Sequence, residues 1–183
     1  MQKENEHNMI SVSSIKITPI GMIWLAYSFK GLTAIDIGGN QGEFLRSLPP
    51  GTEADYSDRH DGLHQAAAQI LEYLDGTRRE FELTIDWTGV SNFQRKALTA
   101  VYDIPYGETR SYGQIAAQIG KPQAPRAVGR ANATNPIPLV IPCHRVIGAD
   151  GNLRGYGAGD GIKTKAWLLD LEKRSKPNKS SLE

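Results

Sequence analysis

The 183-residue sequence contains a single cysteine, Cys143, which excludes an internal disulfide and a metal cluster built on cysteines. It has no apolar run near the roughly 18 residues that span a membrane. It also does not open with the basic and then apolar segments of a secretion signal. We therefore expect a cytoplasmic protein with no membrane partner. Hydrophobic residues make up 39% and charged residues 22%, as is usual for a soluble chain of one domain or two small ones.

The overall charge of +1 hides an uneven distribution. Residues 1–90 carry 7 Lys and Arg against 13 Asp and Glu, a net charge of −6, whereas residues 91–183 carry 14 against 7, a net charge of +7. An acidic half joined to a basic half is typical of a polyanion-binding module beside a partner domain that does not bind. Solvated charge alone would give the same pattern.

Short apolar segments separated by turn residues predict an antiparallel sheet in the first half. The first dozen residues should be loose and residues 51–62 should form a surface loop. His60 and His64 lie four residues apart, but no third ligand is evident, and we expect no metal. The expected strands are residues 15–17, 22–29 and 32–37 and, after a helix over 62–74, residues 81–85.

The second half has a helical pattern. Ser91 and Gln94 fit a capping box at the start of one helix. Two short helices, about 111–119 and 124–131, are joined by a glycine-containing turn, as in a helix-turn-helix, although any packed pair of helices gives this pattern. Arg126 and Arg130 share a face of the second helix, which argues against its complete burial. A last helix is expected over 163–171. The fold class predicted is α+β, with a small antiparallel sheet and helix followed by a mostly helical, winged-helix-like part.

Cys143 is followed directly by His144. A lone cysteine is usually a small buried hydrophobe. However, a thiol of pKa about 8.5 is mostly protonated at neutral pH, and a neighbouring imidazole is a standard activator. Pro142 should end the strand-like apolar run 137–141 sharply at the thiol. Neighbours in a strand point to opposite faces, so a Cys–His pair requires a turn or a bridging water.

Residues 135–146, Asn-Pro-Ile-Pro-Leu-Val-Ile-Pro-Cys-His-Arg-Val, resemble the active-site signature of the O6-alkylguanine-DNA alkyltransferases, the methylated-DNA–protein-cysteine methyltransferase family. The matching block covers about 91–172, nearly half of the chain. The resemblance implies a ribonuclease-H-like supporting domain at 1–90, a DNA-binding and alkyl-transfer domain at 91–173 and a flexible tail at 174–183. The other matching segments are Pro105-Tyr106-Gly107-Glu108, Ser111-Tyr112, Arg126-Ala127-Val128-Gly129, Trp167-Leu168-Leu169 and Glu172.

The resemblance implies direct-reversal DNA repair. An alkyl group on O6 of guanine, with O4 of thymine as a further candidate, would pass to Cys143 in a single-turnover, suicide reaction after the nucleotide is flipped out of double-stranded DNA. It implies a monomer with no cofactor. The family's regulatory members with a four-cysteine zinc domain are excluded by the cysteine count.

The resemblance also assigns roles to residues. Cys143 would be the nucleophile, His144 its base, Glu172 the group that orients His144, Tyr112 the proton donor to the departing guanine and Asn135 a hinge. Tyr156, Val146 and Gly157 would form the substrate pocket, beside an apparent insertion at 157–161. Arg126 would enter the base stack, and the remaining DNA contacts would be Ala127, Gly129, Arg130, Ser111 and Arg145.

Three alternatives stay open. A non-catalytic, alkyltransferase-like damage-binding protein would normally have another residue at Cys143. A Cys–His hydrolase would turn over an ester or amide without DNA. An architectural helix-turn-helix protein would bind DNA whether or not Cys143 is present.

Overall fold

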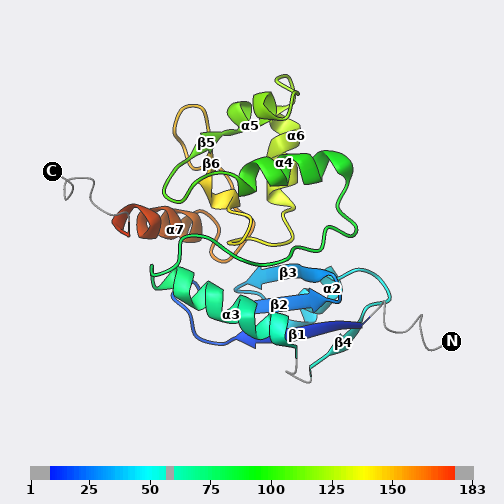
Figure 1. Cartoon of the computed structure of the whole chain (residues 1–183). Helices are drawn as coiled ribbons and strands as arrows, with labels where there is room; N and C mark the ends of the chain where they lie inside the picture. The colour runs from blue at the N-terminus through cyan, green and yellow to red at the C-terminus, as the bar shows by residue number, and fades with distance from the viewer. Residues whose placement is uncertain (1–8, 57–59, 176–183) are drawn as a thin grey trace.

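The computed structural model describes residues 9–56 and 60–175, which stack as two parts in Figure 1. The first part is a sheet with a helix on each face, and the second is mostly helical. The predicted α+β class is therefore confirmed. None of the described helices is long and apolar enough to cross a membrane.

The sheet has the spatial order β3-β2-β1-β4, with β1, β2 and β3 antiparallel and β4 parallel to β1. Strand β1 covers Met9–Ile15, so the strand predicted at 15–17 is misplaced and the predicted loose start is wrong for residues 9–12, whereas residues 1–8 lie outside the described part of the chain. Ile10 and Val12 alternate along it and are buried, which gives the segment a core face. Strand β4 lies inside the predicted loop 51–62. The strands are β1 (Met9–Ile15), β2 (Ile23–Ser28), β3 (Gly31–Ile37) and β4 (Glu53–Asp55).

Two helices cover opposite faces of this sheet. Helix α2 (Gln41–Ser47) packs Phe44 against the side of β1 and β2 that carries Ile10, Val12 and Ala26. Helix α3 (Asp61–Leu74), predicted to within one residue, packs on the other side. His60 is its N-cap, because its Nδ1 accepts a hydrogen bond from Gly62 N at 3.1 Å. Within the described residues no group of three potential ligands could hold a metal.

The second part contains the expected pair of short helices, α5 and α6. Ser111 forms a complete capping box with Gln114 at the start of α5. The box predicted at Ser91 is only half formed, because the Gln94 side chain bonds to Thr134 instead. The elements are α4 (Asn92–Tyr102), β5 (Arg110–Ser111), α5 (Tyr112–Gln118), α6 (Pro125–Ala133), the 3-10 turn η1 (Cys143–Arg145), β6 (Val146–Ile147) and α7 (Ile162–Arg174).

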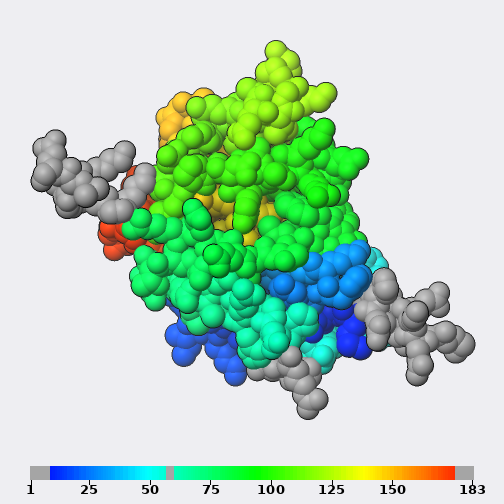
Figure 2. Space-filling view, viewed as in Figure 1, coloured from blue at the N-terminus to red at the C-terminus, as the bar shows by residue number. Residues whose placement is uncertain are grey.

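The outer edge of β3 joins the two parts. Ile35 N donates to Pro136 O at 2.8 Å, and Gly159 N donates to Ile37 O at 2.9 Å. The predicted strand 81–85 is only an isolated bridge between Leu32 and Ile85 on the same edge. One buried core runs through both parts, and they pack directly against each other in the space-filling view (Figure 2). The division into domains at residue 90 stays a prediction.

Gly31, where β3 begins, has φ +143°, and a Cβ there would lie 2.4 Å from Thr84 O. Gly89 also has positive φ, +81°, but its Cβ would meet nothing within 4 Å. Backbone strain costs of order 1–3 kcal/mol at either position, and only Gly31→Ala adds a backbone overlap. We expect Gly31→Ala to lower the free energy of unfolding by at least about 1 kcal/mol more than Gly89→Ala. Urea titration of both variants tests this, and equal midpoints would contradict the overlap.

Candidate active site

The signature segment folds as a turn rather than as an extended run. Leu139 has φ +73°, and Ile141 N donates to Ile137 O at 2.9 Å. After Pro142 the chain makes one 3-10 turn, in which Arg145 N donates to Pro142 O at 2.9 Å. The predicted strand-like run 137–141 is therefore wrong. The chain turns at Cys143 instead of alternating as a strand, so the condition stated above for a Cys–His pair is met.

Two asparagines fix this turn. Asn135 Nδ2 donates to Ile141 O at 2.9 Å, and its Oδ1 accepts from Ile137 N at 3.0 Å, so its side chain bridges backbone groups. Asn132, which we did not predict, donates from Nδ2 to Cys143 O at 3.1 Å. Asn132 lies on α6 and is buried. A polar residue near a helix end gives no signal in the sequence that its side chain turns inward.

Cys143 lies at the wall of a pocket of about 340 Å³ next to α6. The thiol-bearing side chain is 5% exposed. Four predicted residues share this pocket with it, but Val146 does not: its side chain is fully buried, so its assignment to the substrate pocket is corrected. Small side chains leave the space open. The lining is Tyr112, Gly129, Asn132, Ala133, Cys143, Gly155, Tyr156 and Gly157.

The thiol is held in its protonated form in the free protein. Burial raises the pKa of Cys143, and the neighbouring Asn135 and Tyr156 side chains and the charge of Lys165 offset only part of the rise. Lys165, a second residue that we did not predict, is fully buried and donates from Nζ to Val146 O at 2.6 Å and to Leu153 O. Burial lowers the pKa of Lys165 to about 8. Because the pKa of Cys143 is raised, a base is needed to ionise this thiol at neutral pH.

His144 has the environment of such a base. Its Nε2 lies 2.9 Å from Glu172 Oε1, and both side chains are fully buried. Burial lowers the pKa of His144 in spite of the opposing effect of Glu172, so the imidazole is neutral. Its Nδ1 is buried and has no hydrogen-bond partner among the described residues. The Glu172 carboxylate thus orients Nε2, while Nδ1 can still accept a proton.

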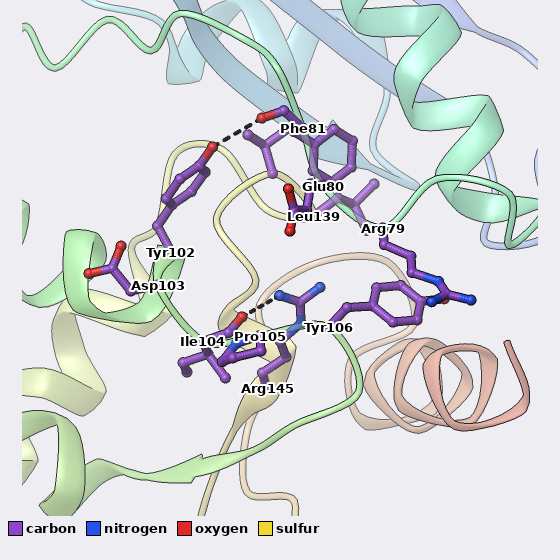
Figure 3. Close-up of a pocket in the computed structure, with 11 residues that line it drawn as sticks. Arg79, Glu80, Phe81, Tyr102, Asp103, Ile104, Pro105, Tyr106, Leu139 and Arg145 are labelled. Carbon is purple, nitrogen blue, oxygen red and sulfur yellow. Dashed lines mark hydrogen bonds between the residues drawn. The ribbon is translucent and has the colours of Figure 1, made fainter. Parts of the chain in front are cut away.

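Arg145 does not face DNA. It is 5% exposed, and its Nε and Nη2 donate to the Glu172 carboxylate at 2.8–3.1 Å. Its Nη1 donates to Ile104 O at 2.6 Å, as Figure 3 shows. The prediction that it contacts DNA is therefore wrong. Gly107 N donates to Glu172 Oε2 at 2.8 Å. Burial acts to raise the pKa of Glu172, but His144 and Arg145 outweigh it and lower the pKa to about 2.

Tyr73 completes this network and was not predicted. It comes from α3 in the first part, and its hydroxyl donates to Glu172 Oε1 at 2.7 Å and lies 3.1 Å from His144 Nε2. In the sequence Tyr73 continues the apolar face of α3 after Ile70, so it is indistinguishable from a core residue.

Behind the network, a second cavity of about 320 Å³ is lined by residues that include Arg79, Tyr102, Tyr106 and Arg145 (Figure 3).

Helix α6 presents a basic face beside the pocket. Arg126, Ala127 and Arg130 are exposed, and neither arginine forms an ion pair within the described part of the chain. Gly129, one turn along, lines the pocket itself. Ser111 uses its hydroxyl to cap α5. An exposed cationic helix face therefore adjoins the opening that leads to Cys143.

These features describe a protein in which a cysteine-lined pocket opens beside a pair of short helices with a basic face. The model of the 6-O-methylguanine DNA methyltransferase DNA binding domain matches residues 92–174, and that of the ribonuclease-like domain of the same enzymes matches 13–87. The methylated-DNA–protein-cysteine methyltransferase of Methanosarcina barkeri is 43% identical over 158 residues, 86% of this chain and 94% of the relative. That of Mycolicibacterium paratuberculosis is 54% identical over 112 residues, 61% and 66% of the two chains.

Among solved structures, Mycobacterium tuberculosis OGT in complex with DNA superposes with a TM-score of 0.76 at 41% identity, covering 91% of this chain and 95% of that chain. The chain belongs to the methylated-DNA–protein-cysteine methyltransferase family. The predicted family is confirmed, and the alternatives of a non-catalytic damage-binding protein and of a Cys–His hydrolase are not favoured.

Glu172→Gln should destabilise the protein, because Arg145 would be left buried without a counter-charge. Breaking such a pair costs about 3–5 kcal/mol. A carboxylate whose pKa falls from 4.5 to about 2 on folding stabilises the protein above pH 4.5 and loses that contribution as the pH falls to 2. The difference between wild type and variant should therefore shrink across this range. Denaturant titrations at several pH values measure it, with the exposed Glu82→Gln as control. A difference independent of pH would contradict the assignment.

Proposed function

We propose that this protein repairs alkylated double-stranded DNA by transferring an alkyl group from O6 of guanine to the sulfur of Cys143. The observation that carries the proposal is the position of Cys143 in a pocket beside α6, with the His144–Glu172 pair behind it. The names of the relatives, and the DNA in the crystal structure of the M. tuberculosis protein, support it. The protein acts as a monomer on one damaged base at a time.

The transfer exchanges one bond for another. The thiolate of Cys143 attacks the first carbon of the alkyl group, a carbon–sulfur bond forms, and the bond from that carbon to O6 breaks with its electron pair on the guanine. His144 Nδ1 takes the thiol proton, directly or through a water, and Glu172 stabilises the imidazolium that results. The step as written uses neither a metal nor an organic cofactor.

Tyr112 supplies the proton that the departing guanine requires. It lines the pocket with Cys143, and burial raises the pKa of Tyr112 although Asn132 acts in the opposite sense. A phenol that remains protonated is a suitable donor to a leaving base. The proton on His144 restores the tyrosine through solvent. Because a thioether is not readily hydrolysed, each molecule reacts once and stays alkylated.

The basic face of α6 binds DNA and brings the damaged guanine to the pocket of Cys143. The O6 atom is inaccessible inside a duplex, so the nucleotide must be flipped out, which costs a few kcal/mol. Arg126 fills the gap in the stack and offsets part of that cost, as wedge residues do in the minor groove. Ala127 and Gly129 let the helix backbone approach the groove closely, and Arg130 and Ser111 contact phosphates. Tyr156 and Gly157 contact the extruded base.

Intact mass spectrometry after incubation with a duplex containing O6-methylguanine tests the reaction. We expect wild type to gain one methyl group, on Cys143, with one base repaired per protein molecule. Cys143→Ser should gain nothing and should still bind the duplex. Binding without any mass gain in wild type would indicate a damage-binding protein, and turnover of an ester without DNA would indicate a hydrolase. Either result rejects the proposal.

Arg126→Ala should slow transfer from duplex DNA by about tenfold, the equivalent of the part of the flipping cost that the side chain offsets. Transfer from the free O6-alkylguanine base should be unaffected, because no flipping is involved. Arg130→Ala, four residues away on the same helix, should weaken DNA binding in a salt-dependent way and recover its rate at saturating DNA. Equal loss with duplex and free base would contradict the role given to Arg126.

A further inference from the structure

The hydroxyl of Tyr73, which comes from the first part of the molecule, contacts His144, the proposed general base. It is separated by 71 residues from His144 and by 99 from Glu172, yet contacts both. We infer that Tyr73 is a positioning residue for alkyl transfer, which holds His144 in the tautomer with the proton on Nε2 and leaves Nδ1 free to accept the thiol proton. The inference rests on the proposed function for its kinetic consequence, but its structural content is independent of it.

The direction of each hydrogen bond follows from the number of hydrogens. A phenol has one hydrogen, and an ionised carboxylate only accepts. The shorter of the two contacts of Tyr73 is to Glu172 Oε1, at 2.7 Å, so its proton points there. The oxygen then turns a lone pair towards His144 Nε2 at 3.1 Å. Nε2 faces two acceptors, Glu172 Oε1 and the Tyr73 oxygen, and must carry the ring hydrogen.

The opposite tautomer is disfavoured by the other side of the ring. Were the hydrogen on Nδ1, it would be a buried donor with no partner among the described residues, while Nε2 would place a lone pair against the carboxylate. An unsatisfied buried donor is unfavourable. The arrangement with Nε2–H leaves Nδ1 as an open acceptor, which is what the transfer step requires.

Glu172 and Tyr73 together fix the orientation of the His144 ring better than Glu172 does alone. Its carboxylate is shared with Arg145, which donates to it from two nitrogens, and with the backbone of Gly107. Tyr73 adds a second acceptor beside Nε2 that belongs to a rigid neighbour, because its ring packs on Phe81 at 5.3 Å and edge-on to Tyr106 at 6.0 Å. Helix α3 of the first part of the chain thus helps to orient the His144 imidazole through Tyr73.

Tyr73→Phe keeps the ring and removes the hydroxyl. We expect transfer at pH 7 to slow by about tenfold, a fraction of what a general base contributes. The deficit should shrink as the pH rises, because a thiol ionised by solvent no longer needs His144 as its base. Affinity for the duplex should not change. A residue that only packs would give a loss independent of pH, and that outcome, or no loss at all, would overturn the inference.

Tyr102→Phe is the matched control. Its hydroxyl donates to Phe81 O at 3.1 Å across the second cavity and does not touch the His144 network (Figure 3). Tyr102→Phe removes a tyrosine hydroxyl and its one hydrogen bond outside the His144 network, so this variant should keep the wild-type pH profile.

Nitrogen-15 NMR of the imidazole rings reads the tautomer without any reaction. The His144 signals are assigned by their loss in His144→Asn. We expect Nε2 protonated and Nδ1 unprotonated in wild type, and a mixture of tautomers in Tyr73→Phe. An unchanged tautomer in the variant would reject the inference even if alkyl transfer is confirmed, and failure of wild type to transfer alkyl groups would reject the proposed function alone.

Discussion

A carboxylate with no exposure to water determines how four segments of this protein meet. Glu172 is fully buried and ionised, so it requires donors on every side. Tyr73, Gly107, His144 and Arg145 supply them from α3, the loop after α4 and the 3-10 turn. Helix α7 therefore docks correctly only when the other three are in place. The charge that orients the base also links the formation of the site to the folding of both parts.

The reactive thiol poses the opposite requirement. Burial in the wall of the pocket raises the pKa of Cys143, which works against the thiolate that the proposed transfer requires. Lys165 opposes this effect, because its charge favours the thiolate, and the proposed base is the next residue, His144, whose Nδ1 has no partner among the described residues. In the proposed transfer the thiol therefore stays protonated until His144 takes its proton and the alkyl carbon is attacked.

The parts of this structure that were predictable depend on local spacing. Helix α3, the cap at Ser111 and the short helix pair follow from periodicity and capping residues. The start of β1 at Met9 was missed, because Ile10 and Val12 become core residues only when Phe44 of α2 packs against them. Arg145 was misassigned to DNA for a related reason: an arginine beside a nucleophile gives no sign in the sequence that its charge is matched by a residue far along the chain. Tyr73 and Lys165 were missed because their polar atoms act through contacts that only tertiary structure creates.

The pocket wall depends on the sheet in a similar way. The glycine-rich segment 155–161 has few side chains to hold it, yet Gly159 N bonds to Ile37 O at 2.9 Å at the edge of β3. Gly38 and Gly159 have positive φ, +80° and +55°, and a Cβ at Gly159 would lie 2.6 Å from Thr164 Oγ1, so both positions favour glycine. The same edge holds Pro136, just before the active-site turn, through Ile35. Because β3 anchors both the wall that carries Gly157 and the segment that carries Cys143, the width of the pocket between them is set by a strand of the first part. The segment 157–161, where the resemblance predicts an insertion, is therefore tied to the same strand as the segment that carries Cys143.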